Sequence, residues 1–244
     1  MKFAPIVPIE YLDLVKERDY HLILPHLIEN SDYASVYKAV DGFKILDNGE
    51  AEGLQPDPEE LFRAANAVSA HEIVVPDTLR DADRTIEQCR EFSKLAAKHP
   101  KYSYMAVVQG SDLAEIMKCF MFYQTQGWIQ RVAFPRAWYE LHRGLRASMA
   151  ESMADELRRS FLGVHCLGAN AFLQEPILLA SIPGSNPISG MDTSLPASAA
   201  IAGEDLSIVS ATTPRQDGFF EYPYKSTTHA LMEHNINVYT GWCR

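Results

Sequence analysis

The chain has 244 residues, of which 47% are hydrophobic, and it carries a formal net charge of −10. This length is typical of a single (β/α)8 barrel, and the apolar content suffices for one large core, which argues against intrinsic disorder. The acidic balance argues against indiscriminate nucleic-acid binding, which needs a basic surface, although a local basic strip can coexist with an acidic body.

Short apolar runs recur along the chain and predict eight strands. In chain order they are Phe3–Val7, His21–Leu27, Phe43–Leu46, Glu72–Val75, Tyr104–Val108, Arg131–Phe134, Gly163–Leu167 and Ile188–Met191. Stretches of helical character separate most of these runs. This alternation predicts an α/β fold, namely a (β/α)8 TIM barrel that forms one domain over residues 1–244.

Amphipathic patterns predict the helices that cover such a barrel. They span Pro58–Ser69, Asp81–Lys98, Asp112–Gln126, Trp138–Ser160 and Asn170–Ala180. The first has a favourable start, because Asp57 can cap it and Pro58 suits the first turn.

The chain changes character after Pro196. Ala197–Tyr224 is rich in Ala, Ser, Gly and Pro, with one strand-like run at Leu206–Val209. We therefore expect residues 197–226 to form an irregular segment. Thr227–Tyr239 has helical character, and residues 227–240 are expected to form the last barrel helix.

The cysteines and the N-terminal segment bear on compartment. The four cysteines are far apart and form no CxxC pair, which makes a disulfide framework or zinc ribbon improbable and favours a reducing cytoplasm. The first residues lack the apolar core of a signal peptide, and no stretch reaches the ~20 apolar residues of a membrane span. We expect a soluble, cytoplasmic protein that does not bind a membrane.

A group of arginines lies in the second half of the chain. It comprises Arg131, Arg136, Arg143, Arg146, Arg158 and Arg159. They fit either a local basic strip or a solvated helical face.

Several predicted strands end on polar or small residues. Asp47 follows the third, Asp77 the fourth, Gln109 the fifth, and Asp192 the eighth. The carboxyl ends of barrel strands surround one opening, where active sites are built, so these side chains are expected to converge. Asp47 and Asp192 stand beside small residues that let a ligand approach, and such a pair suggests acid–base or nucleophilic chemistry.

Each of these residues also has an ordinary structural explanation. Asp47 precedes Asn48 and Gly49, which together suit a simple turn. Asp192 and Asp77 could each cap a following helix, and Gln109 could satisfy backbone groups at a strand end. No His, Asp or Glu set has metal-site spacing, and the histidines, His165 among them, suit packing or support of other residues better than metal ligation.

Five motifs in order resemble the guanine transglycosylases, typified by the tRNA-guanine transglycosylases. In chain order, the family has the motifs Asp-Ser-Gly-Gly, Asp-Glu-Cys, Val-Gln-Gly, Phe-Asp-Cys-Val-Leu-Pro and Glu-His-Asn-Ile. The corresponding segments of this chain, in the same order, are Asp47-Asn48-Gly49-Glu50, Val75-Pro76-Asp77-Thr78, Val108-Gln109-Gly110, Met191-Asp192-Thr193-Ser194-Leu195-Pro196 and Glu233-His234-Asn235-Ile236. The resemblance covers about residues 40–240.

Two differences from the family's motifs indicate which members of the family the chain resembles most. The family's Gly-Leu-Ala-Val-Gly strand is replaced by Arg131–Arg136, and the cysteines and histidine of its zinc subdomain are absent. The chain is thus most similar to the compact phage-type DNA 7-deazaguanine transglycosylases, with a shortened C-terminal insertion and no metal cofactor. The partners this implies are guanine-containing DNA, a free 7-deazaguanine base, and a possible protein partner or homodimer, in the host cytoplasm if a phage encodes it.

The resemblance also implies roles. Asp192 would be the nucleophile that traps the sugar, and Asp47 the general acid and later the base, the two-carboxylate logic of retaining glycosidases. Asp77 would accept from the guanine edge and Gln109 would donate to O6, which requires a flipped or single-stranded base. Asn48, Gly49 and Gly110 complete the base site, and Phe134 or Tyr104 could stack on the base.

Three alternatives stay open. The polymer could be tRNA, although the missing zinc subdomain favours DNA. The chain could be a non-catalytic nucleic-acid-binding subunit, against which retention of both Asp47 and Asp192 argues. An unrelated barrel lyase or aldolase would usually show a Schiff-base lysine or clustered metal ligands at its strand ends.

Overall fold

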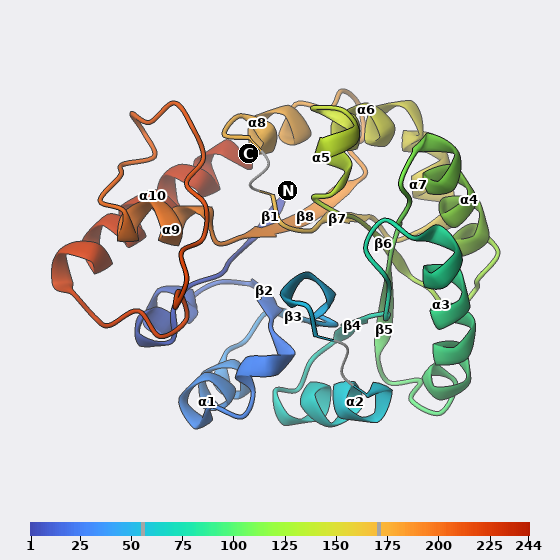
Figure 1. Ribbon diagram of the computed structural model, residues 1–244, viewed down its shortest axis with the longest axis horizontal. Coiled ribbons are helices and arrows are strands. Elements are labelled where there is room, and N and C mark those ends of the chain that lie inside the picture. Colours follow the sequence, from blue (N-terminus) through green and yellow to red (C-terminus); the bar gives the residue numbers. More distant parts are fainter. Residues whose placement is uncertain (55–56, 170–171) are drawn as a thin grey trace.

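The computed structural model has eight parallel strands in a nearly closed barrel with helices around it, which confirms the predicted fold class (Figure 1). The structure describes residues 1–54, 57–169 and 172–244. The strands are β1 (Lys2–Pro5), β2 (Tyr20–Ile23), β3 (Phe43–Leu46), β4 (Glu72–Val74), β5 (Ser103–Val107), β6 (Arg131–Phe134), β7 (Val164–Cys166) and β8 (Ile188–Thr193). All eight predicted strands are therefore present.

The strands follow the order β1-β8-β7-β6-β5-β4-β3-β2, and each recorded pair is parallel. β1 and β2 lie side by side and complete the ring, without a strand ladder between them in the described part of the chain. The predicted run His21–Leu27 is longer than β2, because Pro25–Leu27 turns into a short 3-10 helix, η2. A proline at the start of such a turn lacks the N–H that a strand would use.

Helices form the outer layer of the barrel. They are α1 (Ser31–Ala39), α2 (Pro58–Ala67), α3 (Ala82–Ala96), α4 (Leu113–Gln124), α5 (Trp138–Leu141), α6 (Leu145–Ser152), α7 (Ala154–Ser160), α8 (Glu175–Ala180), α9 (Leu195–Ile201) and α10 (Ser226–Trp242). The 3-10 helix η1 (Ile9–Val15) follows β1, and η3 (Glu50–Glu52) follows β3 at the carboxyl ends of the strands. Asp57 caps α2 as predicted, accepting from the Glu59 N–H at 2.8 Å.

The single helix predicted over Trp138–Ser160 is wrong in its continuity. Gly144 adopts a left-handed conformation with φ +83°, which ends one helical path and starts the next. Met153, with φ −107°, separates α6 from α7. Of the helix predicted from Asn170 to Ala180, residues 170–171 lie outside the described residues, and α8 begins at Glu175.

The C-terminal prediction needs a second correction. Residues 197–201 belong to α9 and are not irregular, since Pro196 in the first turn favours a helix start. Leu206–Val209 forms no strand but a turn that α10 holds in place, because Leu206 N–H donates to the Asn235 side chain at 2.9 Å. The predicted last helix is confirmed as α10, which packs against α9.

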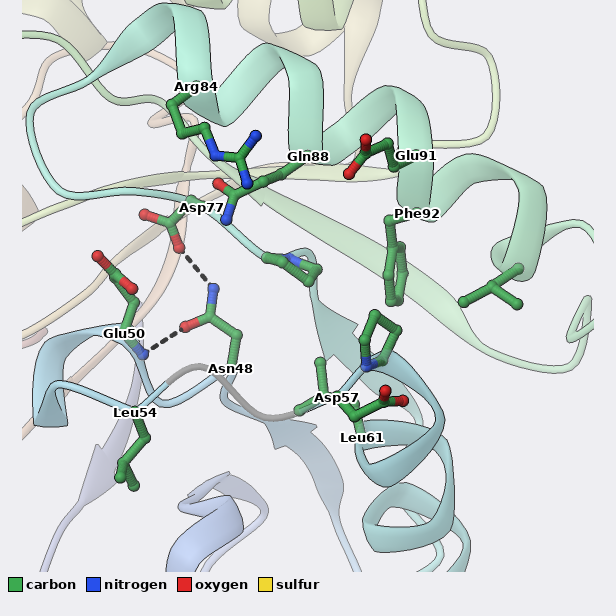
Figure 2. A pocket seen from close by; sticks show the side chains of 13 residues that line it. Asn48, Glu50, Leu54, Asp57, Leu61, Asp77, Arg84, Gln88, Glu91 and Phe92 are labelled. Carbon is green, nitrogen blue, oxygen red and sulfur yellow. Dashed lines mark hydrogen bonds between the residues drawn. The ribbon is translucent and has the colours of Figure 1, made fainter.

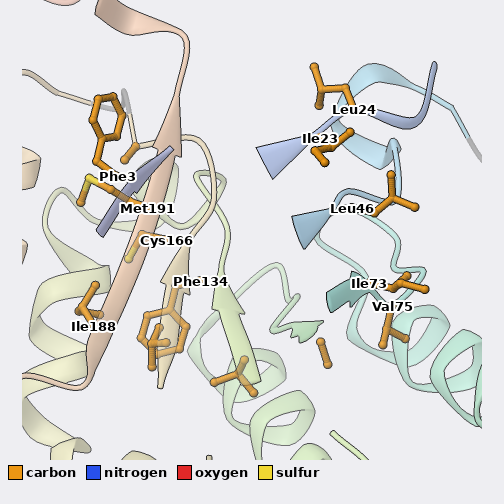
Figure 3. Close-up of a cluster of buried hydrophobic side chains, with 14 of the residues drawn as sticks. Phe3, Ile23, Leu24, Leu46, Ile73, Val75, Phe134, Cys166, Ile188 and Met191 are labelled. Atoms are coloured by element: carbon orange, nitrogen blue, oxygen red, sulfur yellow. The ribbon is translucent and has the colours of Figure 1, made fainter. Parts of the chain in front are cut away.

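Alternate strand residues divide the core into two layers. Aliphatic side chains and one tyrosine fill the barrel interior: Ala4, Tyr20, Leu22, Ile45, Val74, Met105, Val107 and Ala133. Their neighbours along the strands, such as Ile23, Leu46 and Phe134, belong to the larger core between the barrel and its helices (Figure 3). This alternation follows from the two-residue period of a strand and leaves the strand ends free to build a site.

Two of the six arginines belong neither to a basic strip nor to a solvated face. Arg146 is buried, pairs with Glu175 at 2.6 Å, and donates to the Phe134 carbonyl. Arg131 Nε lies 3.1 Å from Oε2 of buried Glu72, and these two residues begin β6 and β4. Because these guanidinium groups are held inside the fold, the predicted cluster does not form as one surface.

Within the described residues, no helix combines the length and apolar character required to cross a membrane.

Candidate active site

A cavity of about 600 Å³ opens at the carboxyl ends of the strands. Its floor includes Leu22 and Val107 from the barrel interior. Polar side chains from five strand ends line it, namely Asp47, Asn48, Asp77, Gln109, Arg136 and Asp192. The topology thus brings the two predicted catalytic carboxylates, which lie far apart in sequence, to one space.

Asp47 stands directly after β3 in a tight turn. Its Oδ2 accepts from the Gly49 N–H at 3.3 Å, and Gly49 has φ +83°, a conformation that glycine adopts without strain. The turn suggested by the sequence is therefore present, and it aims the carboxyl group into the cavity. Burial raises the pKa of Asp47 to about 7, and the nearby charge of Asp192 adds to this increase.

Asp77 follows β4 and is held by two amide side chains. Asn48 Nδ2 donates to its Oδ1 (Figure 2), and Gln109 Nε2 donates to its Oδ2 at 2.5 Å. Burial raises the pKa of Asp77 to about 7, even though both hydrogen bonds act in the opposite direction. The cap of α3 is Asp81 and not Asp77, which removes the structural explanation of Asp77 as a helix cap.

Gln109 uses most of its hydrogen-bonding groups within the protein. Its Oε1 accepts from the Arg80 N–H at 3.0 Å, and one of its Nε2 hydrogens goes to Asp77. Within the part of the chain that the structure describes, one amide hydrogen is left for a ligand. Gln109 therefore serves both as a backbone partner at a strand end and as an orienting group for Asp77.

Asp192 lies at the end of β8 and does not cap α9, whose start is served by Thr193 Oγ1 accepting from the Leu195 N–H at 3.1 Å. Its Oδ1 contacts His165 Nε2 at 3.0 Å, and Gly168 N–H donates to the same oxygen at 3.2 Å. The carboxylate is only 3% exposed yet lines the cavity. It is thus pre-oriented by groups from β7 and from the loop after it.

Three residues predicted near the base lie elsewhere, and a fourth, Gly49, does not line the cavity. Phe134 faces the helical layer and packs on Trp138 with ring centroids 4.5 Å apart, so in this conformation it cannot stack on a base in the cavity. The Tyr104 hydroxyl donates to the His99 carbonyl in the outer core. Gly110 does not line the cavity either; a Cβ there would lie 2.5 Å from Ile116 N, so this glycine permits close packing of α4.

The segment after α9 forms part of the cavity rim. Thr212, Thr213, Pro214 and Arg215 line it, and Arg215 binds Glu52 of η3 with N–O distances of 2.7 and 2.6 Å. The prediction of an irregular segment gave no indication of this role, because an ion pair between residues 163 positions apart has no local sequence signal.

A second cavity of about 310 Å³ lies beside the first, between the β3 and β4 loops and α2 and α3 (Figure 2). Asn48 and Asp77 border both cavities. Among the described residues, no three His, Cys, Asp or Glu side chains are placed to hold one metal ion.

No protein-family model matches this chain, and no curated protein sequence matches it.

The buried acids predict that stability falls as pH rises. Asp47 and Asp77 have folded pKa values of about 7, above the ordinary value of 3.8. The native state therefore keeps protons that the unfolded state loses between about pH 4 and 7, so the free energy of unfolding decreases across this window and levels off above it. Asp47→Asn removes one such acid and should be more stable than the wild type at pH 8 by about 1–3 kcal/mol, with little difference at pH 4.5.

Urea unfolding at several pH values measures this effect. The exposed acid Asp83 offers a matched control, since Asp83→Asn should leave the pH dependence unchanged. An Asp47→Asn variant whose stability parallels the wild type from pH 4.5 to 8 would contradict the raised pKa.

Proposed function

We propose that this protein exchanges guanine in DNA for a 7-deazaguanine base through a covalent aspartyl–sugar intermediate. The proposal is supported most by one observation: Asp47 and Asp192 are both buried and line one cavity at the carboxyl ends of the barrel strands. The ordered motifs that resemble the guanine transglycosylases supply the choice of reaction.

The two carboxyl groups divide the chemistry. Asp192, as the carboxylate, attacks C1′; the C1′–N9 bond breaks, its electron pair goes to the guanine, and Asp47 protonates the departing base. The incoming base then gives its N9 proton to Asp47, N9 attacks C1′, and the bond from C1′ to Asp192 breaks to restore the carboxylate. Two displacements retain configuration at C1′, as in retaining glycosidases.

The pKa of Asp47 suits both of its roles. A group with a pKa of about 7 is present in both protonation states near neutral pH, so it can donate to one base and accept from the next. Asp192 has a different role, that of the nucleophile, and His165 Nε2 and the Gly168 N–H both contact its carboxyl group.

The polar edge formed by Asn48, Asp77 and Gln109 favours a purine with donors on one edge. Both oxygens of Asp77 are held by amide groups, which fixes the plane in which its remaining lone pairs accept. Guanine presents N1–H and an exocyclic amine on one edge and so matches an acceptor of this kind. A base without those donors would leave the remaining lone pairs of Asp77 without a partner, and such a mismatch discriminates against that base.

Nucleoside mass spectrometry tests the proposal. Purified protein is incubated with guanine-containing DNA, or with tRNA, together with 7-cyano-7-deazaguanine, and each polymer is digested to nucleosides. We expect the 7-deazaguanine nucleoside in DNA, with an equal amount of guanine released. Exchange in tRNA alone would show that tRNA, and not DNA, is the substrate. Exchange in neither polymer would contradict the proposed reaction.

A non-catalytic subunit is the main alternative of a different class. It predicts binding of nucleic acid without guanine release, so the same incubation separates the two, and Asp77→Asn provides a matched variant. In the enzyme, Asp77→Asn should weaken use of the incoming base; in a binding subunit, it should leave nucleic-acid affinity unchanged.

A further inference from the structure

A buried chain of hydrogen bonds connects the barrel interior to Asp192. The Tyr20 hydroxyl lies 2.8 Å from His165 Nδ1, and His165 Nε2 lies 3.0 Å from Asp192 Oδ1. The exposed fractions of these residues are 2%, 0% and 3%. Neither Tyr20 nor His165 lines the cavity, so they reach it only through Asp192.

The chemistry of the three groups indicates one arrangement of their protons. Burial raises the pKa of Tyr20, so its hydroxyl keeps its hydrogen at neutral pH. That hydrogen can be donated to His165 Nδ1, which leaves Nε2 to carry the imidazole hydrogen. A carboxylate only accepts, so Nε2–H toward Asp192 completes the chain with every group satisfied.

The two oxygens of Asp192 are not equivalent. Oδ1 receives both His165 Nε2 and the Gly168 N–H, the latter at 3.2 Å. Oδ2 receives only the Gly168 N–H, at 3.3 Å, among the contacts of the described residues. Oδ2 is therefore the oxygen with a free lone pair among the contacts of the described residues.

We propose that His165 and Tyr20 position the nucleophile, holding Asp192 Oδ1 so that Oδ2 attacks the sugar. The inference rests on the proposed function. In the first step Oδ2 bonds to C1′ as the base leaves; in the second this bond breaks and its electron pair returns to the carboxylate. The His165 N–H stabilises the charge that reappears on the carboxylate, and its fixed orientation limits the attack to one geometry.

The barrel interior is shaped to hold this chain. A Cβ at Gly190 would lie 2.6 Å from ring atoms of Tyr20, so the glycine on β8 makes room for the tyrosine. Phe43 stacks on the same ring with centroids 6.0 Å apart. Tyr20 is thereby confined on two sides, as a residue that orients another must be.

Kinetics of three variants and one control variant test the proposal. His165→Leu removes the donor and should lower kcat by about 100-fold, with the KM for the incoming base unchanged. His165→Gln keeps an amide N–H near the Nε2 position and should recover most of this loss. Tyr20→Phe should lower kcat by about 10-fold. His21→Gln alters a buried histidine that contacts the Asp41 carbonyl instead, and should match the wild type.

Two kinetic results would contradict the proposal. If His165→Leu exchanges bases at the wild-type kcat, or if only KM changes, the positioning role is wrong. Should His165→Leu fail to fold, the Tyr20→Phe variant decides, because it removes a single oxygen atom.

The protonation of His165 gives a readout that needs no substrate. Nitrogen-15 NMR of labelled protein should show the Nε2–H tautomer of His165, and Tyr20→Phe should shift the Nδ1 resonance, because that nitrogen loses its hydrogen-bond donor. An Nδ1–H tautomer, or a doubly protonated ring at neutral pH, would overturn the assigned chain. If the wild type exchanges no base, the proposed function fails, whereas the hydrogen-bond chain is still judged by this spectrum.

Discussion

Asp192→Asn is expected to abolish guanine exchange, with a loss of at least about 10⁴-fold in kcat, while the protein stays folded. An amide of the same shape cannot form the ester that holds the sugar. The substitution keeps Oδ1 as an acceptor for His165, so the local packing should persist. Release of labelled guanine from DNA measures the rate, and circular dichroism with thermal unfolding verifies the fold.

The control for this variant is an aspartate outside the cavity. Asp83 is exposed on α3 and pairs with Lys118, so Asp83→Asn should exchange guanine at the wild-type rate. Undiminished exchange by Asp192→Asn would show that another group is the nucleophile.

Asp47→Asn is expected to lower the exchange rate by about 10²–10⁴-fold, because the departing base loses its proton donor. The pH profile provides the sharper evidence. Since the pKa of Asp47 is about 7, guanine release in the wild type should decrease as pH rises through 7 and the acid loses its proton. In Asp47→Asn this decrease should be absent from the residual rate.

A substrate with a better leaving group isolates the role of Asp47. A 7-methylguanine in DNA carries a positive charge and departs without receiving a proton. Its release should therefore be nearly the same in the wild type and in Asp47→Asn, whereas release of guanine differs greatly. Equal losses on both bases would assign Asp47 to binding or folding and not to proton transfer.

The fold could be predicted largely because barrel strands are short, buried and separated by amphipathic helices. Ile45 lies in the barrel interior and Leu46 in the outer core, so both faces of β3 are buried. The strand is therefore visible in the sequence as consecutive apolar residues. The break near Gly144 could not be predicted, since a single glycine within a helical pattern is often tolerated. Helix α9 was missed because the composition of residues 197–201 is shared by helices and loops.

The candidate site could be predicted in part for a similar reason. Asp47, Asp77, Gln109 and Asp192 follow strands, and the topology of a barrel brings strand ends together. Their partners could not be predicted. Tyr20 looks like any aromatic core residue in the sequence, and its role depends on a contact with His165 across the barrel, 145 residues away.

Phe134 shows the opposite error. Its place at the end of β6 predicts contact with a base, but strand residues alternate in direction. Ala133 points into the barrel, and Phe134 consequently points toward the helices. The register of a short strand decides this direction, and a shift of the register by one residue reverses it. The sequence alone does not give the register.

Mapping the covalent intermediate is the most direct test of the claim that Asp192 holds the sugar. The protein is mixed with guanine-containing DNA without an incoming base, quenched with acid, digested with nuclease and protease, and analysed by peptide mass spectrometry. We predict a nucleotide remnant, lacking its guanine, attached at Asp192 and absent from Asp192→Asn. Base exchange that proceeds with no adduct, or with an adduct on a different residue, would contradict the account.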